Sequence, residues 1–283
     1  MDPVRRFRPS INRKRIGQRD ANFLHGWIGR HFHAIDPIVQ EAFCQIMRSI
    51  SHRRRQPLRL TGAHIARVAR DVPDPGPTNR YTQLTDADRV ALADRLLAEN
   101  AGAPFWVFAY GSLIWKPAFE YVDNRNCIAH GWRRSFCLNI QGWRATPEQP
   151  GLMLALAKGG ACSGMAYRMP DDDPQGRMLR LLDREVSYHV DVPWLRWLTV
   201  RANGEAFRAL AFYCSPKDDD DLVRLAITEQ AARLARAVGP KGSCAEYLLN
   251  TVEHLEALGI RDRYLWRLRA LVAAEIDSLP FET

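Results

Sequence analysis

Residues 105–114 form the stretch that most restricts how this chain can fold. Six apolar residues, four of them aromatic, run from Phe105 to Tyr110 and stop at Gly111. The run predicts a buried β-strand at 105–110. Glycine after a strand allows a positive φ or a close approach to a ligand, and successive N–H groups in such a turn can bind a carboxylate. A purely structural turn is the alternative. The candidate binding residues are Tyr110, Gly111, Ser112 and Leu113.

A carboxylate interrupts the apolar pattern of a helix expected at 174–185. Met178, Leu181 and Leu182 define the apolar face, and the same spacing brings Glu185 onto it. Burial disfavours a charged carboxylate, so it raises the pKa and can produce a general acid/base near neutral pH. Glu185 is therefore a candidate catalytic residue. The alternative is a carboxylate that reaches water from the last turn of the helix.

The remaining pattern predicts an α+β fold, with a curved sheet or small barrel and helices outside it. A capping box of Ser243 and Glu246 is expected to start one helix, and Gly259 to end it. Besides 105–110, strands are expected at 131–140, 151–158, 162–169, 194–201 and 206–214. Besides 174–185, helices are expected at 86–99 (capped by Thr85), 219–238, 244–258 and 262–277.

The positive charge of the chain is concentrated at its N-terminal end. The net charge is +8, and residues 1–55 alone hold eleven arginines and one lysine against four acidic residues. We expect residues 1–70 to be a basic extension, disordered over 1–20, with one helix at 36–50. Docking of that helix on the main domain is the favoured interpretation, ahead of a membrane surface, nucleic acid or a protein partner. A linker and helix are expected at 71–104, followed by the catalytic domain at 105–283.

Several classes of function lack their usual signals. No apolar run reaches the length of about 18 residues that spans a membrane. The six cysteines are scattered without metal-ligand spacing, which predicts reduced thiols in a cytoplasmic protein and no metal cofactor. Walker A, G-x-G-x-x-G and H-E-x-x-H patterns are absent, so NTPase, dinucleotide-binding and metalloprotease interpretations lose support.

Six motifs occur in an order that resembles the ChaC-type γ-glutamylcyclotransferases. The first is Trp106-Val-Phe-Ala-Tyr-Gly-Ser-Leu-Ile-Trp-Lys-Pro117. The resemblance extends over roughly 105–277 and finds no counterpart in the first hundred residues. The other five motifs are 131–136 (GWRRSF), 144–151 (RATPEQPG), 160–168 (GACSGMAYR), 182–185 (LDRE) and 242–251 (GSCAEYLLNT).

The resemblance implies a small mixed β-barrel with surrounding helices and an enzyme that cleaves glutathione into 5-oxoproline and cysteinylglycine. It implies no metal or organic cofactor. The Tyr110–Leu113 loop would hold the γ-glutamyl group, and Glu185 would be the acid/base. The expected partner is a small-molecule substrate, with neither nucleic acid nor a membrane span. The sequence carries no signal for an oligomeric state.

Two further residues are weaker candidates for substrate binding. Arg144 could pair with a substrate carboxylate or form a surface salt bridge. Tyr247 shares the apolar face of its helix with Leu248 and Leu255, which favours core packing over substrate contact.

The sequence departs from the family pattern at Val186–His189, Ala145 and 217–221, around the expected mouth of the site. These departures leave another γ-glutamyl amine or dipeptide open as substrate. Two alternatives from other classes are a non-catalytic γ-glutamyl-binding regulator and a nucleic-acid-binding protein that uses its basic arm. A carboxylate on an apolar face is costly without a role, which argues against the regulator. The charge balance of residues beyond 55 argues against nucleic acid.

Overall fold

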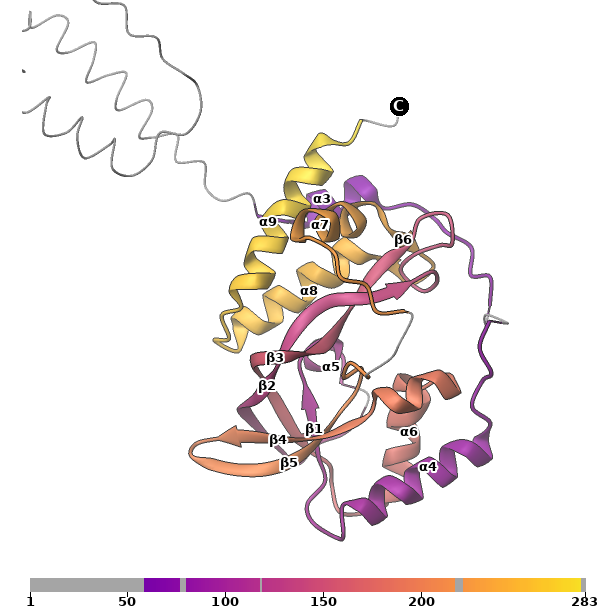
Figure 1. The fold of residues 1–283 in the computed structure, drawn as a ribbon, viewed down its shortest axis with the longest axis vertical. Helices are drawn as coiled ribbons and strands as arrows, with labels where there is room; N and C mark the ends of the chain where they lie inside the picture. Colours follow the sequence, from indigo (N-terminus) through magenta and orange to yellow (C-terminus); the bar gives the residue numbers. More distant parts are fainter. Residues whose placement is uncertain (1–58, 77–79, 118, 217–220, 281–283) are drawn as a thin grey trace, which may run out of the picture. The chain divides into compact units, whose positions relative to one another are not determined.

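Five strands among the described residues close into a barrel in the order β1-β3-β2-β4-β5, which confirms the expected architecture. The computed structural model describes residues 59–280 except 77–79, 118 and 217–220 (Figure 1). β1 runs antiparallel to β3 and parallel to β5, so the barrel is mixed. The strands are β1 (Trp106–Ala109), β2 (Asp123–Ile140), β3 (Gly151–Arg168), β4 (Arg196–Ala202) and β5 (Glu205–Ala211).

β1 lies at the centre of the core, as its apolar run predicts. All four of its residues are buried. The packing against β3 is close because Gly164 faces Phe108: a Cβ at Gly164 would come within 2.8 Å of the Phe108 ring and 2.5 Å of the Ala109 carbonyl oxygen. β1, at whose end the candidate loop begins, therefore pairs with β3 along its length and with β5 at Val107.

β2 and β3 form a long antiparallel hairpin whose strands have 18 residues each. The pattern predicted two strands, 151–158 and 162–169, where the structure has one. Gly159 and Gly160, with φ of 97° and 78°, bend the strand, and pairing resumes beyond them. Glycine takes positive φ without steric cost, so the chain bends here without ending the ladder.

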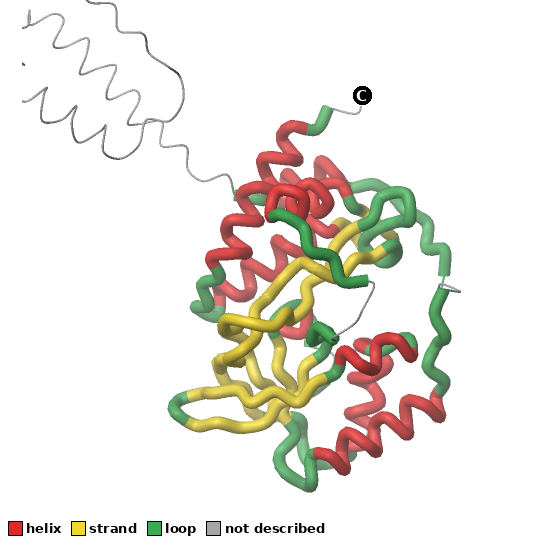
Figure 2. The backbone as a smooth tube through the Cα atoms, in the orientation of Figure 1, coloured by secondary structure: helices red, strands yellow, loops and turns green. Residues whose placement is uncertain are grey.

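The helices pack in two groups against the barrel (Figures 1 and 2). One group contains α4 (Asp86–Glu99) and α6 (Pro174–Glu185), which contact each other and have the predicted bounds. Thr85 caps α4 by accepting a hydrogen bond from the Asp88 N–H, as expected. The other group contains α3 (Gly62–Val68), α7 (Ile227–Arg236), α8 (Cys244–Ala257) and α9 (Arg263–Ser278).

Some elements differ from the expectation. α7 is shorter than the predicted helix at 219–238 because the preceding segment pairs with β2, where the Val223 N–H donates to the Cys137 carbonyl oxygen at 2.8 Å. Gly259 follows the end of α8 with φ of 73°, as predicted. Short elements that the pattern missed are α5 (Ser112–Trp115), the 3₁₀ helix η2 (His189–Trp194), β6 (Val238–Gly239) and β7 (Gly242–Ser243).

α3 lies within the stretch that we expected to be an extension. It packs on α9, and Leu60 and Val68 are buried beside it. α3 therefore belongs to the same compact unit of the chain as the barrel. The disorder and the helix expected at 1–20 and 36–50 fall outside the described residues. No helix in the part of the chain that the structure describes is long and apolar enough to cross a membrane.

Candidate active site

A cavity of about 440 Å³ opens where β1 ends, between the barrel and α6. All seven residues singled out in the sequence line it. The lining also includes Lys116, Trp143, Arg184, Tyr213 and Lys241. The seven are Tyr110, Gly111, Ser112, Leu113, Arg144, Glu185 and Tyr247.

The loop after β1 leads directly into the one-turn helix α5. Gly111 has φ of −138°, so the expected positive φ is not what glycine provides here. Close approach is the reason: a Cβ at Gly111 would lie 2.9 Å from the Tyr247 hydroxyl. The N–H groups of Ser112 and Leu113 lie in the first turn of α5, where the helix itself supplies no acceptor. The Leu113 N–H can therefore donate to a ligand in the cavity, and the Ser112 N–H can do so in exchange for its hydrogen bond with the Tyr247 hydroxyl.

Tyr110 is a buried wall of the cavity. Its hydroxyl donates to the Phe212 carbonyl oxygen at 2.8 Å. Its own carbonyl oxygen accepts from Arg134 Nε at 2.7 Å, behind the loop. Burial raises the pKa of the Tyr110 hydroxyl well above its usual value. The side chain is therefore a neutral hydrogen-bond donor whose position is fixed from both ends.

Glu185 is buried, with 7% of its surface exposed, on the same face of α6 as Met178, Leu181 and Leu182. The apolar stripe thus predicted its position correctly, and the solvated alternative is wrong. One carboxylate oxygen, Oε1, lies 3.2 Å from Arg184 Nε. Burial raises the pKa of the Glu185 carboxyl, and the charge of Arg184 opposes this shift in part. Burial of this kind is typical of carboxyls that act as general acids or bases.

Tyr213 is a cavity residue that the sequence did not indicate. Its hydroxyl donates to the backbone carbonyl oxygen of Glu185 at 2.7 Å, which ties the end of α6 to the barrel. Tyr213 has φ of 53°, and Trp143, also in the lining, has φ of 57°. Positive φ is costly for bulky residues and gathers at functional sites. No sequence pattern predicts such a conformation in an aromatic residue.

Tyr247 packs in the core, as expected, and also lines the cavity. Its ring packs edge-on against Trp115 and Phe136, with centroids 6.0 Å away in each case. Its hydroxyl reaches the loop beside Gly111. Burial and the charge of Glu185 raise the pKa of Tyr247 to about 12, while hydrogen bonds with Ser112 oppose the rise. Packing of the ring in the core thus holds the neutral Tyr247 hydroxyl at the cavity.

Arg144 forms a salt bridge, but inside the cavity wall instead of on an open surface. Its Nη1 lies 2.6 Å from Glu246 Oε2 and donates to the Ser243 carbonyl oxygen at 2.8 Å. The expected capping box is only half formed as a result. Ser243 accepts from the Glu246 N–H at 3.0 Å, whereas the Glu246 carboxylate is directed to Arg144. The fold uses Glu246 to orient Arg144 toward the Tyr247 ring.

Comparisons with known proteins identify a family for this chain. A family model described as ChaC-like protein matches residues 105–275. A glutathione-specific gamma-glutamylcyclotransferase of Escherichia coli (strain K12) is 34% identical over 173 residues, 61% of this chain and 74% of the relative. Gamma-glutamylcyclotransferase 2-3 of Arabidopsis thaliana is 32% identical over 168 residues, 56% of this chain and 84% of the relative.

The fold is shared with a solved structure as well. The crystal structure of a yeast gamma-glutamyl cyclotransferase specific to glutathione matches with a TM-score of 0.54 at 22% identity, over 60% of this chain and 96% of that one. A closed mixed barrel with outer helices is the fold that this chain shares with that γ-glutamyl cyclotransferase, an α+β fold. Among proteins with this fold, the chain belongs to the ChaC-like family, whose model matches from β1 into α9.

Proposed function

We propose that this protein cyclises the γ-glutamyl group of glutathione and releases 5-oxoproline and cysteinylglycine. The observation that carries the proposal is the buried Glu185 carboxyl in the same cavity as the N–H groups at the start of α5. The names of the Escherichia coli and yeast proteins, both specific to glutathione, support the choice of substrate.

The substrate contains its own nucleophile, so the reaction needs no nucleophilic side chain from the protein. The α-amine of the γ-glutamyl group attacks its γ-carbonyl carbon, a five-membered lactam closes, and the amide nitrogen of the cysteinyl residue leaves. The protein must fold the substrate so that these atoms meet. Holding reacting groups in such a geometry can contribute about 7–11 kcal/mol to lowering the barrier. A cavity with walls fixed by Tyr110 and Tyr213 suits this task.

Glu185 would move the proton that this reaction transfers. The attacking amine loses a proton and the leaving nitrogen gains one, and a single carboxylate can serve both steps. A raised pKa brings the carboxyl closer to the range in which it accepts and donates protons readily. General acid/base catalysis of this kind typically accelerates a reaction by about 10²–10⁴-fold.

The α5 loop would bind the γ-glutamyl group opposite Glu185. The N–H groups of Ser112 and Leu113 can hold the α-carboxylate or polarise the γ-carbonyl oxygen as charge develops on it. The charge of the lining suits a substrate with two carboxylates. Among the described lining residues, Glu185 is accompanied by four cationic side chains, which are Lys116, Arg144, Arg184 and Lys241.

The decisive experiment incubates the purified chain with glutathione and quantifies 5-oxoproline and cysteinylglycine by mass spectrometry. Equal amounts of the two products are expected. Release of glutamate would mean hydrolysis and would contradict the cyclisation. Parallel reactions with γ-glutamylcysteine and γ-glutamylalanine test whether the departures at Val186–His189 have changed the substrate. Binding of glutathione without turnover would favour the regulator.

A further inference from the structure

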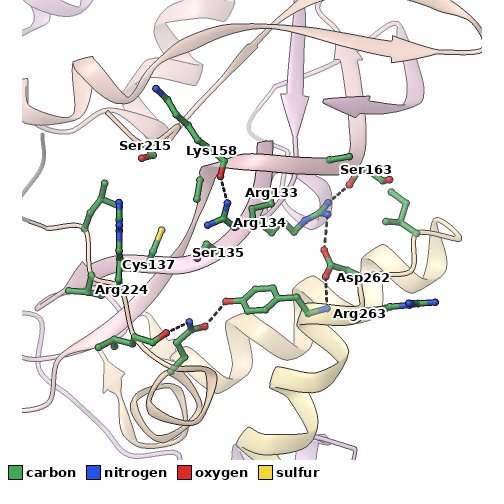
Figure 3. A pocket seen from close by; sticks show the side chains of 18 of the residues that line it. Arg133, Arg134, Ser135, Cys137, Lys158, Ser163, Ser215, Arg224, Asp262 and Arg263 are labelled. Atoms are coloured by element: carbon green, nitrogen blue, oxygen red, sulfur yellow. Dashed lines mark hydrogen bonds and ion pairs between the residues drawn. The ribbon is translucent and has the colours of Figure 1, made fainter. Parts of the chain in front are cut away.

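A second and larger hollow lies outside the barrel, apart from the candidate active site. It measures about 1100 Å³ and lies between the β2–β3 hairpin, the segment before α7 and the start of α9 (Figure 3). It shares none of its described lining residues with the cavity that contains Glu185. Ligand pockets commonly have volumes of about 300–1000 Å³, so this hollow can enclose a sizeable small molecule.

The described lining of this hollow is strongly basic. It includes six cationic side chains and one carboxylate, although residues 56–283 carry no net charge as a whole. Positive charge is therefore concentrated here within an otherwise balanced part of the chain. The cationic residues are Arg133, Arg134, Lys158, Arg224, Arg261 and Arg263.

The one carboxylate, Asp262, is already engaged. It lies 3.2 Å from Arg134 Nη1 and accepts hydrogen bonds from the N–H groups of Tyr264 and Leu265 at 3.0 and 3.1 Å. Arg134 is also fully engaged, because its other nitrogens donate to the carbonyl oxygens of Tyr110 and Ser163. This pair is structural and neutralises itself, which leaves the other cations without a counter-ion from the lining.

Arg133 and Arg224 are the cations best placed to hold a ligand. Figure 3 shows them on either side of the Cys137 side chain. Arg133 Nη1 donates to the Lys158 carbonyl oxygen, which orients the guanidinium and leaves its other N–H groups available. Arg224 forms no ion pair or hydrogen bond with any other residue that the structure describes. Ser135 and Ser215 contribute hydroxyl groups to the same lining.

We propose that this hollow is a binding site for a small molecule that carries several phosphate groups. Guanidinium groups present planar arrays of N–H donors that match phosphate oxygens. Several cations that line one hollow suit a compact ligand with several negative charges. Nucleic acid requires a basic track that follows an extended backbone, whereas the unpaired cations here surround a single hollow.

The test is calorimetric titration of the full chain with inorganic tripolyphosphate, and separately with ATP, at physiological salt and without divalent metal. Saturable binding of one equivalent is expected. Replacing Arg133 and Arg224 together by Gln should weaken tripolyphosphate binding at least about tenfold, since both lost contacts are charge-assisted. Comparable affinities for both probes would identify the phosphates as the recognised group, and tighter binding of ATP would add recognition of the nucleoside.

The matched control replaces Arg201 and Arg267 by Gln. Both are exposed arginines outside the hollow, and the change in net charge is the same. This control should bind as the unaltered chain does. The single change Arg224→Glu provides a second variant at an exposed position should the double variant fold poorly.

Three outcomes would overturn the site. An equal loss of affinity in the Arg201/Arg267 control would mean that the weaker binding follows from the lower net charge of the chain. Unchanged affinity in the Arg133/Arg224 variant would place the anion elsewhere, for instance on the arginines of residues 1–55. Displacement of tripolyphosphate by 5-oxoproline or glutathione would place it in the cavity of Glu185. Cyclisation of glutathione is measured separately and should persist in the Arg133/Arg224 variant, so failure of this site leaves the proposed function untouched.

Discussion

Arg134 donates from Nε to the Tyr110 carbonyl oxygen at 2.7 Å, across the wall between β2 and the loop that follows β1. The same guanidinium reaches Asp262 and the Ser163 carbonyl oxygen, and only 2% of the side chain is exposed. One side chain therefore anchors the candidate substrate loop, β3 and the start of α9 together.

Replacing Arg134 by Gln should destabilise the fold. Gln cannot reach all three partners, so buried acceptors are left without a donor, and Asp262 loses its counter-ion. We expect a loss of roughly 2–4 kcal/mol in the free energy of unfolding, because truncating one partner of a buried pair is costly. Urea denaturation measures the loss. The neighbouring change Arg133→Gln, at an exposed position, is the control and should cost less than about 0.5 kcal/mol.

Replacing Glu185 by Gln should remove nearly all cyclisation and leave substrate binding largely intact. Gln keeps the volume and the hydrogen-bonding capacity but cannot transfer a proton. The kcat for glutathione should fall by about 10²–10⁴-fold with little change in KM. Asp183→Asn is the control, because that carboxylate is 78% exposed on the opposite face of α6. A variant that kept more than about a tenth of kcat would require another group to move the proton.

The raised pKa of Glu185 makes a further prediction about stability. The folded state holds this proton at a higher pH than the unfolded state, whose carboxyl titrates near its ordinary value of 4.5. Between the two pKa values the native chain binds more protons, so the contribution of Glu185 to stability falls as pH rises through that window. The Glu185→Gln variant lacks this loss. Its free energy of unfolding relative to the unaltered chain should therefore rise from pH 4 upward, and a difference that is flat with pH would contradict the shift.

Tyr213→Phe should weaken catalysis without abolishing it. The change removes the hydrogen bond to the Glu185 carbonyl oxygen, a contact of 2.7 Å that fixes the end of α6. We expect kcat to fall by about 2- to 10-fold, as for the loss of one neutral hydrogen bond of about 0.5–1.5 kcal/mol. Tyr121→Phe, at an exposed tyrosine, should have no effect. Equal rates in both variants would show that the position of Glu185 does not depend on Tyr213.

Truncation at the N-terminal side should distinguish the basic extension from α3. Removal of residues 1–56, outside the compact unit, should leave the rate of cyclisation within a few-fold. Removal of residues 1–70 also takes away α3 with buried Leu60 and Val68, and should lower the free energy of unfolding by about 2 kcal/mol or more. Thermal denaturation and the glutathione assay are measured on both. A collapse of kcat in the shorter truncation would show that the extension contributes to the site.

Features of the site that depend on local periodicity could be read from the sequence. The apolar face of α6 is a repeat over eight residues, and it predicted the burial of Glu185. The run before Gly111 likewise predicted β1. The salt bridge between Arg144 and Glu246 joins residues about a hundred positions apart, so no local pattern contains it. The conformation of Tyr213 depends on neighbours in the folded chain, and no pattern in the sequence indicates it.

The two sides of the candidate active site are built on supports of different kinds. The α5 loop continues a strand that is hydrogen-bonded on both edges, so its position follows from the closure of the barrel. Glu185 ends a helix that lies outside the barrel and packs on α4, and one hydrogen bond from Tyr213 ties this end to the barrel. Substitutions along α4 and α6 can therefore shift Glu185 relative to the α5 loop. Such shifts would change the space between Glu185 and the loop while the barrel stays the same.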